Sequence, residues 1–213
     1  MKITFIGYGN VGAPLADHLQ KQGHVVTLAA ENSASESVTR ALARNPNLLV
    51  ASPQAAVREA EVIFLATPFQ ANEAALKNVA AELSGKILVD CTNPVGPGLS
   101  HGLRSERAGS QWIQSILPDT KVVKAFSIYG FENFENSTYP NYNVQPAMLF
   151  CGNDADSKHT VSGLIAQLGW EPVDVGGLEQ ALHLEHMTLL WVRMVRAKGG
   201  SPHMVWGALR RSN

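Results

Sequence analysis

The sequence predicts an α/β protein built on a doubly wound parallel sheet, with a small C-terminal extension of strands and helices. Short apolar runs of strand length alternate with segments of helical periodicity from the N-terminus to about residue 126. Strands that are apolar along their whole length are typical of a parallel sheet covered by helices on both faces. The first apolar run also leads directly into a glycine-rich turn, which is the most informative segment of the chain.

This turn has the form G-x-G-x-x-G and comprises Gly7, Tyr8, Gly9, Asn10, Val11 and Gly12. An apolar run over 1–6 precedes the turn, and a helical pattern over 13–23 and a β-branched run over 24–29 follow it. A strand, such a turn, a helix and a second strand within about thirty residues form the Rossmann-type unit that binds dinucleotides.

Each glycine of the turn has a mechanical reason. Gly7 allows the tight turn after the strand, Gly9 lets a pyrophosphate approach the backbone, and Gly12 lets the helix pack closely on the sheet. The helix N-terminus then offers free N–H groups and a partial positive charge to the phosphates. The sequence therefore predicts a dinucleotide site, in preference to a glycine-rich turn without a ligand.

The rest of the first 126 residues continues the alternation of strands and helices. Strands are expected over 48–51, 62–66, 86–91 and 121–126, and helices over 36–44, 53–60, 72–83 and 107–116. We expect residues 1–126 to form the dinucleotide-binding domain. Its ligand crevice lies at the carboxyl ends of the strands, so the segments that follow three of them should converge there: Thr67-Pro68, Asn93-Pro94 and Ser127.

The remaining residues, 127–213, are expected to form an extension packed on the same domain. A polar and aromatic loop over 127–146 opens it, and loops of this length in a compact domain are usually functional. A strand over 147–151, a helix over 154–168, a strand over 170–175, a long helix over 177–198 and a last helical piece over 202–210 follow.

Composition excludes several classes of protein. The net charge is −1 and no basic block is present, so neither nucleic acid nor a membrane surface is expected as a partner. No apolar stretch reaches eighteen residues and the chain enters a strand at once, which argues against a membrane span or a signal peptide. Cys91 and Cys151 both lie in apolar runs and suggest a reducing compartment, so cytoplasm is the expected location.

The residues after the second strand should contact the adenosine ribose. Glu31 stands one place beyond Ala30, which lies at the position where an aspartate often serves NAD enzymes. A carboxylate there can accept hydrogen bonds from the ribose hydroxyls and would repel a 2′-phosphate, but a solvated loop glutamate explains Glu31 equally well. Ser33 and Ser35 could instead donate to a phosphate, and Arg40 could reach it.

Asn93 has two readings of equal weight. It could hydrogen-bond the nicotinamide carboxamide, or it could simply form the turn before Pro94. The complete set of expected cofactor-binding residues covers the glycine turn and the ends of four strands: Gly7, Tyr8, Gly9, Asn10, Val11, Gly12, Glu31, Asn32, Ser33, Ala66, Thr67, Pro68, Asn93, Pro94, Ala125 and Ser127.

No side chain stands out as a catalytic acid, base or metal ligand. His183 and His186 share one face of the long predicted helix with Glu179, but no third ligand and no H-E-x-x-H motif accompany them, so a structural role is favoured over zinc. His101 and Arg104 follow the Asn93 loop and are expected at the surface.

Six segments, in order along the chain, carry a family resemblance: Gly7–Gly12, Val89–Pro94, Lys121–Phe126, Phe150–Asp154, Leu168–Asp174 and Leu184–Trp191. Together they resemble the NADPH:coenzyme F420 oxidoreductase family, including its bacterial branch of dinucleotide-binding reductases. The cytoplasmic reductase domain of the STEAP ferric reductases is similar.

The resemblance implies NADP(H) as cofactor, with NAD possible, and hydride exchange with a flavin or deazaflavin stacked on the nicotinamide. It also implies that the extension contributes the flat-ring site and the helices of a homodimer. Two positions depart from the family pattern. Ala30-Glu31 stands where Ser-Arg or Thr-Arg often holds the 2′-phosphate, and Ser127 stands where Asn is common.

Two functional hypotheses follow. The first is an NADP-dependent oxidoreductase that passes hydride between a nicotinamide nucleotide and a flavin or deazaflavin. The second is a nicotinamide-nucleotide sensor or subunit without catalysis of its own. The enzyme should have a second flat-ring site facing the nicotinamide, lined by the 127–142 loop or by a dimer partner, and the sensor should not.

Overall fold

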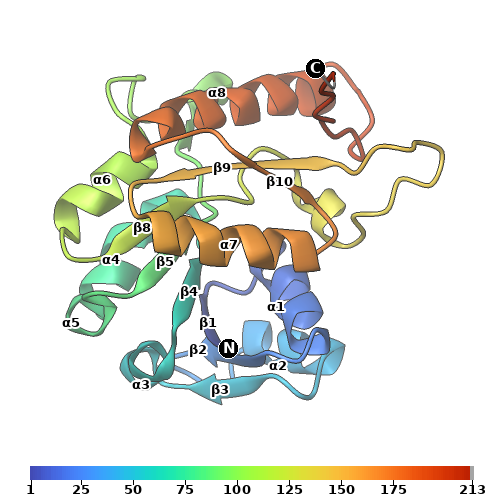
Figure 1. Ribbon diagram of the computed structural model, residues 1–213. Helices are drawn as coiled ribbons and strands as arrows, with labels where there is room; N and C mark the ends of the chain where they lie inside the picture. Colours follow the sequence, from blue (N-terminus) through green and yellow to red (C-terminus); the bar gives the residue numbers. More distant parts are fainter. Residues whose placement is uncertain (212–213) are drawn as a thin grey trace.

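The computed structural model describes residues 1–211, and its centre is one eight-stranded sheet with helices on both faces (Figure 1). The strand order is β10-β9-β8-β5-β4-β1-β2-β3. The strands span Lys2–Ile6 (β1), Val25–Ala29 (β2), Leu49–Ala51 (β3), Val62–Leu65 (β4), Ile87–Asp90 (β5), Lys121–Lys124 (β8), Ala147–Gly152 (β9) and Glu171–Asp174 (β10). Strands β6 (Val95–Gly96) and β7 (Ser100–His101) form a separate small hairpin.

The helices connect the strands in the alternating order that the sequence predicts. They are α1 (Gly12–Lys21), α2 (Glu36–Arg44), α3 (Pro53–Glu59), α4 (Asn72–Lys77), α5 (Ala80–Leu83), α6 (Gly109–Ile116), α7 (Ala155–Gln167) and α8 (Ala181–Val192). Short 3-10 turns cover Phe69–Ala71, Pro97–Leu99, Phe131–Phe134 and Leu178–Gln180, and a π-helical turn, Arg193–Ala197, extends α8.

The expected doubly wound parallel sheet is confirmed for β1 to β5 and β8, which all pair in parallel. Strands β9 and β10 are parallel to each other, but β9 runs antiparallel to β8. The extension therefore lengthens the same sheet. Because β9 runs backwards, its first residue lies near the edge where β5 and β8 end, which brings the 127–146 loop to that edge.

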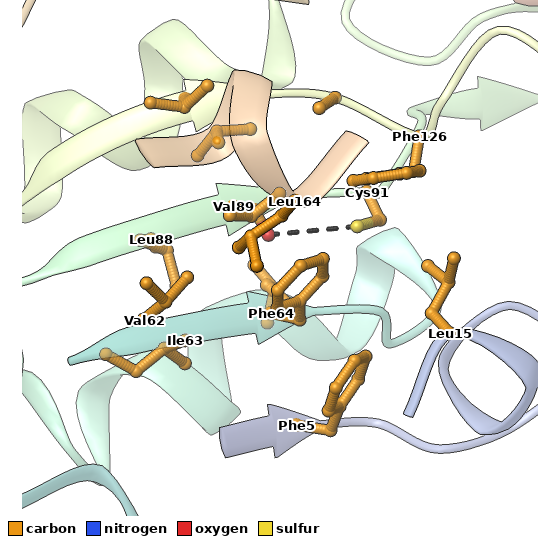
Figure 2. Packing of buried hydrophobic residues seen from close by; sticks show 14 of the residues in the cluster. Phe5, Leu15, Val62, Ile63, Phe64, Leu88, Val89, Cys91, Phe126 and Leu164 are labelled. Atoms are coloured by element: carbon orange, nitrogen blue, oxygen red, sulfur yellow. Dashed lines mark hydrogen bonds between the residues drawn. The ribbon is translucent and has the colours of Figure 1, made fainter. Parts of the chain in front are cut away.

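The register of the strands decides which helices cover which face. Phe5, Phe64 and Val89 are direct neighbours and point to one face, where Leu15 of α1 and Leu164 of α7 pack on them (Figure 2). Alternate residues point to the other face. There Thr4 donates to the Ala56 carbonyl of α3, Ser110 of α6 donates to Asp90, and Glu185 of α8 reaches Lys124.

Three predicted helices differ from the structure. The helix expected over 72–83 is divided, because the buried Val79 leaves the helical conformation between α4 and α5. The long helix over 177–198 begins with a 3-10 turn and ends with a π-helical turn.

The helix expected over 202–210 is wrong. That segment begins with a turn at 202–203 and then pairs with the start of β9: the N–H of Ala147 donates to the carbonyl of Trp206, and Pro146 bridges Gly207. The start of β9 extends beyond the end of β8, and pairing with it satisfies the backbone of this segment better than a short isolated helix would. Among the described residues, none of the helices is both long and apolar enough to cross a membrane.

Candidate dinucleotide-binding site

The three glycines of the first turn have different surroundings, which separates their roles. A Cβ on Gly7, whose φ is +89°, would lie 2.6 Å from the backbone carbon of Ala66. A Cβ on Gly12 would lie 2.1 Å from the carbonyl oxygen of Gly7. A Cβ on Gly9 would meet nothing within 4 Å. Gly7 and Gly12 are thus required by the fold, whereas Gly9 leaves open space above the N-terminus of α1.

That space belongs to a cleft of about 340 Å³ between the ends of β1, β2 and β4. Its lining residues are Ile6, Gly7, Tyr8, Gly9, Ala29, Ala30, Glu31, Ser37, Pro53, Thr67, Ala75 and Asn78. A second hollow of about 270 Å³ shares Tyr8, Gly9 and Ser37 with this cleft and continues along α1 to Arg40, Arg44 and Glu135. The open side of Gly9 therefore lies where both hollows meet, as a bound pyrophosphate requires.

The cleft brings together part of the expected set. Gly7, Tyr8, Gly9, Glu31 and Thr67 line it, and Asn10 lines the adjoining hollow. The other expected residues line neither of these two hollows. Asn32 instead accepts a hydrogen bond from the N–H of Ala34, and Ser33 follows it in the same exposed loop.

The strand-end residues Ile6, Ala29 and Ala30 also line the cleft, and the other four lining residues outside the expected set are Ser37, Pro53, Ala75 and Asn78. They come from α2, α3 and the end of α4, and no motif distinguishes them from ordinary helix residues. Only the close approach of these helices to the strand ends reveals them.

Among residues 1–211, Glu31 is the only charged side chain that lines the cleft. Its Oε1 accepts a hydrogen bond of 2.6 Å from Nδ2 of Asn78. Arg40, the nearest candidate for a phosphate contact, lies in the adjoining hollow with an exposed side chain and pairs with Glu36 at 3.6 Å.

The loop after β5 is fixed from two sides. Nδ2 of Asn93 donates to the carbonyl of Ser127 (2.9 Å), and Oδ1 of Asn93 accepts from Oγ1 of Thr188 on α8 (3.0 Å). Because a carbonyl can only accept, the contact with Ser127 identifies the nitrogen of the Asn93 amide and leaves the oxygen facing Thr188. The hydroxyl of Ser127 is buried and has no hydrogen-bond partner. Thr188 was also missed by the sequence reasoning, because its place in the long helix gave no sign of a contact with Asn93.

A third cavity, of about 270 Å³, lies where the 127–146 loop meets the C-terminal segment. Three large aromatic side chains, Tyr139, Tyr142 and Trp206, line it. The other lining residues are Val144, Gln145, Pro146, His203, Met204, Val205 and Gly207. Burial raises the pKa of Tyr139 to about 12, so its hydroxyl stays protonated and donates to Asn133. The indole nitrogen of Trp206 is buried without a partner.

The expectation that His101 lies at the surface is wrong. Its side chain is 3% exposed, and Nε2 lies 2.7 Å from the Glu185 carboxylate. The short β6–β7 hairpin, which the sequence did not signal, folds His101 inward, while Arg104 is exposed as expected. On α8, His183 is exposed and His186 contacts the hydroxyl of Ser105. Within residues 1–211, no three His, Cys, Asp or Glu side chains are arranged to hold a metal ion.

The parallel sheet, the glycine turn and the open cleft beside Gly9 define a Rossmann-type dinucleotide-binding protein. Comparison with known proteins narrows this class. Residues 2–94 match the family described as NADP oxidoreductase, coenzyme F420-dependent. The F420-dependent NADP reductase of Methanothermobacter marburgensis is 30% identical over 215 residues, covering 91% of this chain and 92% of that protein. The chain belongs to the family of coenzyme F420-dependent NADP oxidoreductases.

Two further relatives agree with this. A crystal structure of a candidate F420-dependent NADP reductase from Arthrobacter sp. FB24 superposes with a TM-score of 0.83 at 27% identity, covering 99% of this chain and all of that one. The rat metalloreductase STEAP3 is 31% identical over 189 residues. This match covers 88% of the present chain but 36% of STEAP3, so the chain spans about a third of that relative.

Proposed function

We propose that this NADP-dependent oxidoreductase transfers hydride between the nicotinamide of NADP(H) and a flavin or a deazaflavin of the coenzyme F420 type. The observation that carries the proposal is the open space at Gly9. The fold requires the absence of a side chain at Gly7 and Gly12, but nothing within 4 Å requires it at Gly9. A ligand whose phosphates approach the backbone explains that glycine.

The adenosine would lie in the 340 Å³ cleft between Glu31, Pro53 and Asn78, and the pyrophosphate over Gly9 at the start of α1. From there the nicotinamide would extend along the carboxyl edge of the sheet toward Thr67, Asn93 and Ser127. In this arrangement the Asn93 loop lies at the carboxamide end of the cofactor, beside the buried Ser127.

For the acceptor ring we propose the aromatic cavity between Tyr139, Tyr142 and Trp206. Flat heteroaromatic rings stack well on such side chains. A hollow lined by Glu135, Tyr139 and Tyr142 adjoins both this cavity and the hollow that contains Arg44 and Glu135.

The nicotinamide and the acceptor ring supply the redox chemistry when both are bound. The contribution of the chain is to hold the two rings in contact and to exclude water, which is mainly positioning. In this division of labour, residues 1–126 bind the nucleotide, and residues 127–213 supply the ring site. We also propose a cytoplasmic location and a homodimer. The dimer proposal rests on two exposed apolar side chains, Leu190 of α8 (51% exposed) and Met194 of the π-helical turn that extends it (36%).

The alternative is a nucleotide sensor without catalysis. Oxidation of NADPH and NADH by the purified protein, with FMN, FAD and a deazaflavin as acceptors, separates the two. The proposal expects turnover with at least one acceptor. Tight NADPH binding without turnover on any of the three would favour the sensor.

A further inference from the structure

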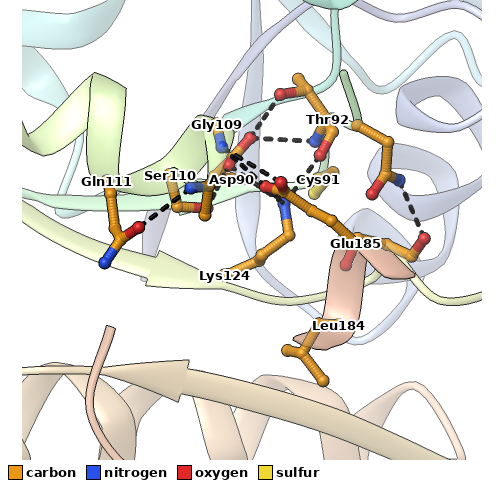
Figure 3. A network of polar contacts seen from close by, with 12 residues as sticks. Asp90, Cys91, Thr92, Gly109, Ser110, Gln111, Lys124, Leu184 and Glu185 are labelled. Atoms are coloured by element: carbon orange, nitrogen blue, oxygen red, sulfur yellow. Dashed lines mark hydrogen bonds and ion pairs between the residues drawn. The ribbon is translucent and has the colours of Figure 1, made fainter. Parts of the chain in front are cut away.

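A buried ionic cluster lies directly beneath the Asn93 loop (Figure 3). Asp90 and Lys124 are the last residues of β5 and β8 and face each other in the sheet register. The Lys124 ammonium lies 3.3 Å from Oδ2 of Asp90, 3.2 Å from Oε1 of Glu185 and 2.8 Å from the carbonyl oxygen of Thr92. Asp90 and the Thr92 carbonyl accept hydrogen bonds from this ammonium, and Glu185 forms an ion pair with it.

The three charged side chains are shielded from solvent, with exposed fractions of 0% for Asp90, 0% for Lys124 and 1% for Glu185. Burial alone would lower the pKa of Lys124, but the two carboxylates outweigh burial and hold its pKa above the ordinary value. The lysine is therefore charged. Burying such groups costs several kcal/mol per ion, and a packed apolar replacement is often equally stable or more stable. Stability alone is a poor reason for this cluster.

Every neighbour of Glu185 in the cluster is a donor. Besides Lys124, its carboxylate accepts from the N–H of Gly109, at the start of α6, and from His101. The tautomer of His101 follows from its other nitrogen: Nδ1 accepts from the N–H groups of Leu103 and Ser105, so the proton resides on Nε2 and is donated to Glu185.

The cluster is continuous with the nucleotide cleft. The Asp90 carboxylate accepts from the hydroxyl of Thr92, which accepts from Asn72, which accepts from the hydroxyl of Thr67 in the lining of the cleft. Thr92 is also the residue before Asn93. Its backbone is thus held by Lys124 on one side and its side chain by Asp90 on the other.

Helix α8 contacts this region at two points one turn apart. Glu185 enters the cluster, and Thr188, three residues later, donates to Asn93 and to the carbonyl of Ser127. The ion pair Lys124–Glu185 therefore fixes the position and rotation of α8 on the sheet. Through its contacts with Asn93 and Ser127, Thr188 then fixes the loop at the proposed nicotinamide site.

From this geometry we propose that Lys124 and Glu185 are positioning residues for hydride transfer. They hold the Thr92–Asn93 backbone and helix α8 in one arrangement, so that the carboxamide end of the nicotinamide is oriented toward the acceptor. Neither residue touches the reacting atoms. The inference rests on the proposed function for its catalytic readout, but the orientation of bound NADPH can be measured without any acceptor.

The main variant is Glu185→Gln. The N–H₂ group of the new amide would face a donor, either Lys124, His101 or the N–H of Gly109. The cluster must therefore rearrange, although the side-chain volume at 185 stays the same. We expect the Kd for NADP⁺ to change by less than about threefold, because the Gly9 turn and the adenosine cleft are untouched. We expect kcat to fall by about tenfold to a hundredfold, the usual effect of a small misplacement of reacting groups. The fluorescence lifetime of bound NADPH should change as well.

A matched control separates positioning from general destabilisation. Leu164→Ala removes a buried side chain of α7 on the opposite face of the sheet and lowers the unfolding temperature without touching the cluster. If Leu164→Ala lowers kcat and changes NADPH fluorescence as much as Glu185→Gln does, the proposal is overturned and the cluster is structural.

A double-mutant cycle keeps the test decisive if Glu185→Gln folds poorly at higher temperature. Thr188→Val removes the contacts of the hydroxyl with Asn93 and the Ser127 carbonyl and keeps the shape of the side chain. If Glu185 acts through Thr188, the two fold-changes in kcat will not multiply. Independent, multiplicative effects would contradict the inference. Absence of turnover in the wild type would refute the proposed function alone. NADPH fluorescence in the wild type, the two single variants and the double variant would still decide the positioning role.

Discussion

The Asn78 amide donates a hydrogen bond of 2.6 Å to the Glu31 carboxylate. This contact joins the end of α4 to the loop that follows β2. This contact holds a negative charge at the rim of the proposed adenosine cleft, and none of the described residues that line this cleft is cationic. A 2′-phosphate at this rim would meet repulsion, while ribose hydroxyls would find an acceptor. Discrimination between NADPH and NADH should therefore be modest in this chain.

Replacing Glu31 by Arg should strengthen NADPH binding and leave NADH binding nearly unchanged. One charge-assisted contact to the phosphate is worth about 2 kcal/mol, or more than tenfold in Kd. Glu31→Gln is the control, because it removes the charge but can keep the contact with Asn78. Both cofactors would be titrated by calorimetry. A wild-type protein that already prefers NADPH about a thousandfold, roughly 4 kcal/mol, would contradict this view of the rim.

Gly9→Val should abolish most nucleotide binding without unfolding the protein. Its side chain would project into open space, where the structure offers no clash and the phosphates are expected. Gly163→Val is a matched control on the exposed surface of α7, where a Cβ also meets nothing within 4 Å. The unfolding temperature and the NADP⁺ affinity would be measured for both. Unchanged affinity in a folded Gly9→Val protein would exclude the site.

Alanine at His183 or His186 should lower turnover by less than about tenfold, well below the ~10² to 10⁴ of a lost general acid or base. Both side chains are exposed on α8, and hydride transfer between two rings does not require them. Turnover would be followed across pH. A variant that loses a thousandfold and flattens a bell-shaped profile would indicate proton-transfer chemistry at these histidines.

Acid stability should depend on Asp17 of α1. Burial alone would raise the pKa of Asp17, but hydrogen bonds from Lys21, Arg44 and Asn45 hold its pKa below the ordinary value. The folded protein thus binds the proton less readily than the unfolded chain does. The stabilisation is complete above the unfolded pKa of about 4 and is lost as the pH falls through the folded value.

Asp17→Asn should therefore cost about 2 kcal/mol of unfolding free energy at neutral pH and weaken the dependence on pH in the acid range. An amide N–H₂ group would face the same donors. Urea unfolding between about pH 2 and 7 would measure both effects. Glu73→Gln, at an exposed pair with Lys77, is the control and should change stability by less than about 0.5 kcal/mol. Equal effects from the two variants would refute the prediction.

Much of the fold was readable in the sequence because apolar periodicity reports burial. Within the runs 1–6, 62–66 and 86–91, Ile3–Ile6, Val62–Leu65 and Leu88–Asp90 are buried in the structure, and the alternation of the runs with helices left few topologies. The errors have a common cause. The extended pairing of Trp206 with Ala147 and the inward turn of His101 depend on partners far away in the sequence, which local patterns do not report.

The site was predictable to the same extent. The Gly7–Gly12 turn is local, so its geometry followed from spacing. Asn78 and Thr188 are ordinary helix residues whose contacts with Glu31 and Asn93 arise only when helices pack against the strand ends. Lys124 offered a partial signal, since a lysine at the end of an apolar strand is unusual unless it is paired.

The most direct test of the central claim is a single turnover with NADPH that carries deuterium at C4 of the nicotinamide, prepared separately with each of the two C4 positions labelled. A deazaflavin is the informative acceptor, because the hydrogen it accepts is bound to carbon and does not exchange with water. We expect one of the two labelled samples to deliver its deuterium to the reduced deazaflavin in a one-to-one ratio with NADPH oxidised. Bound NADPH that leaves the deazaflavin, FMN and FAD all oxidised would contradict the account and identify the protein as a nucleotide-binding subunit without this activity.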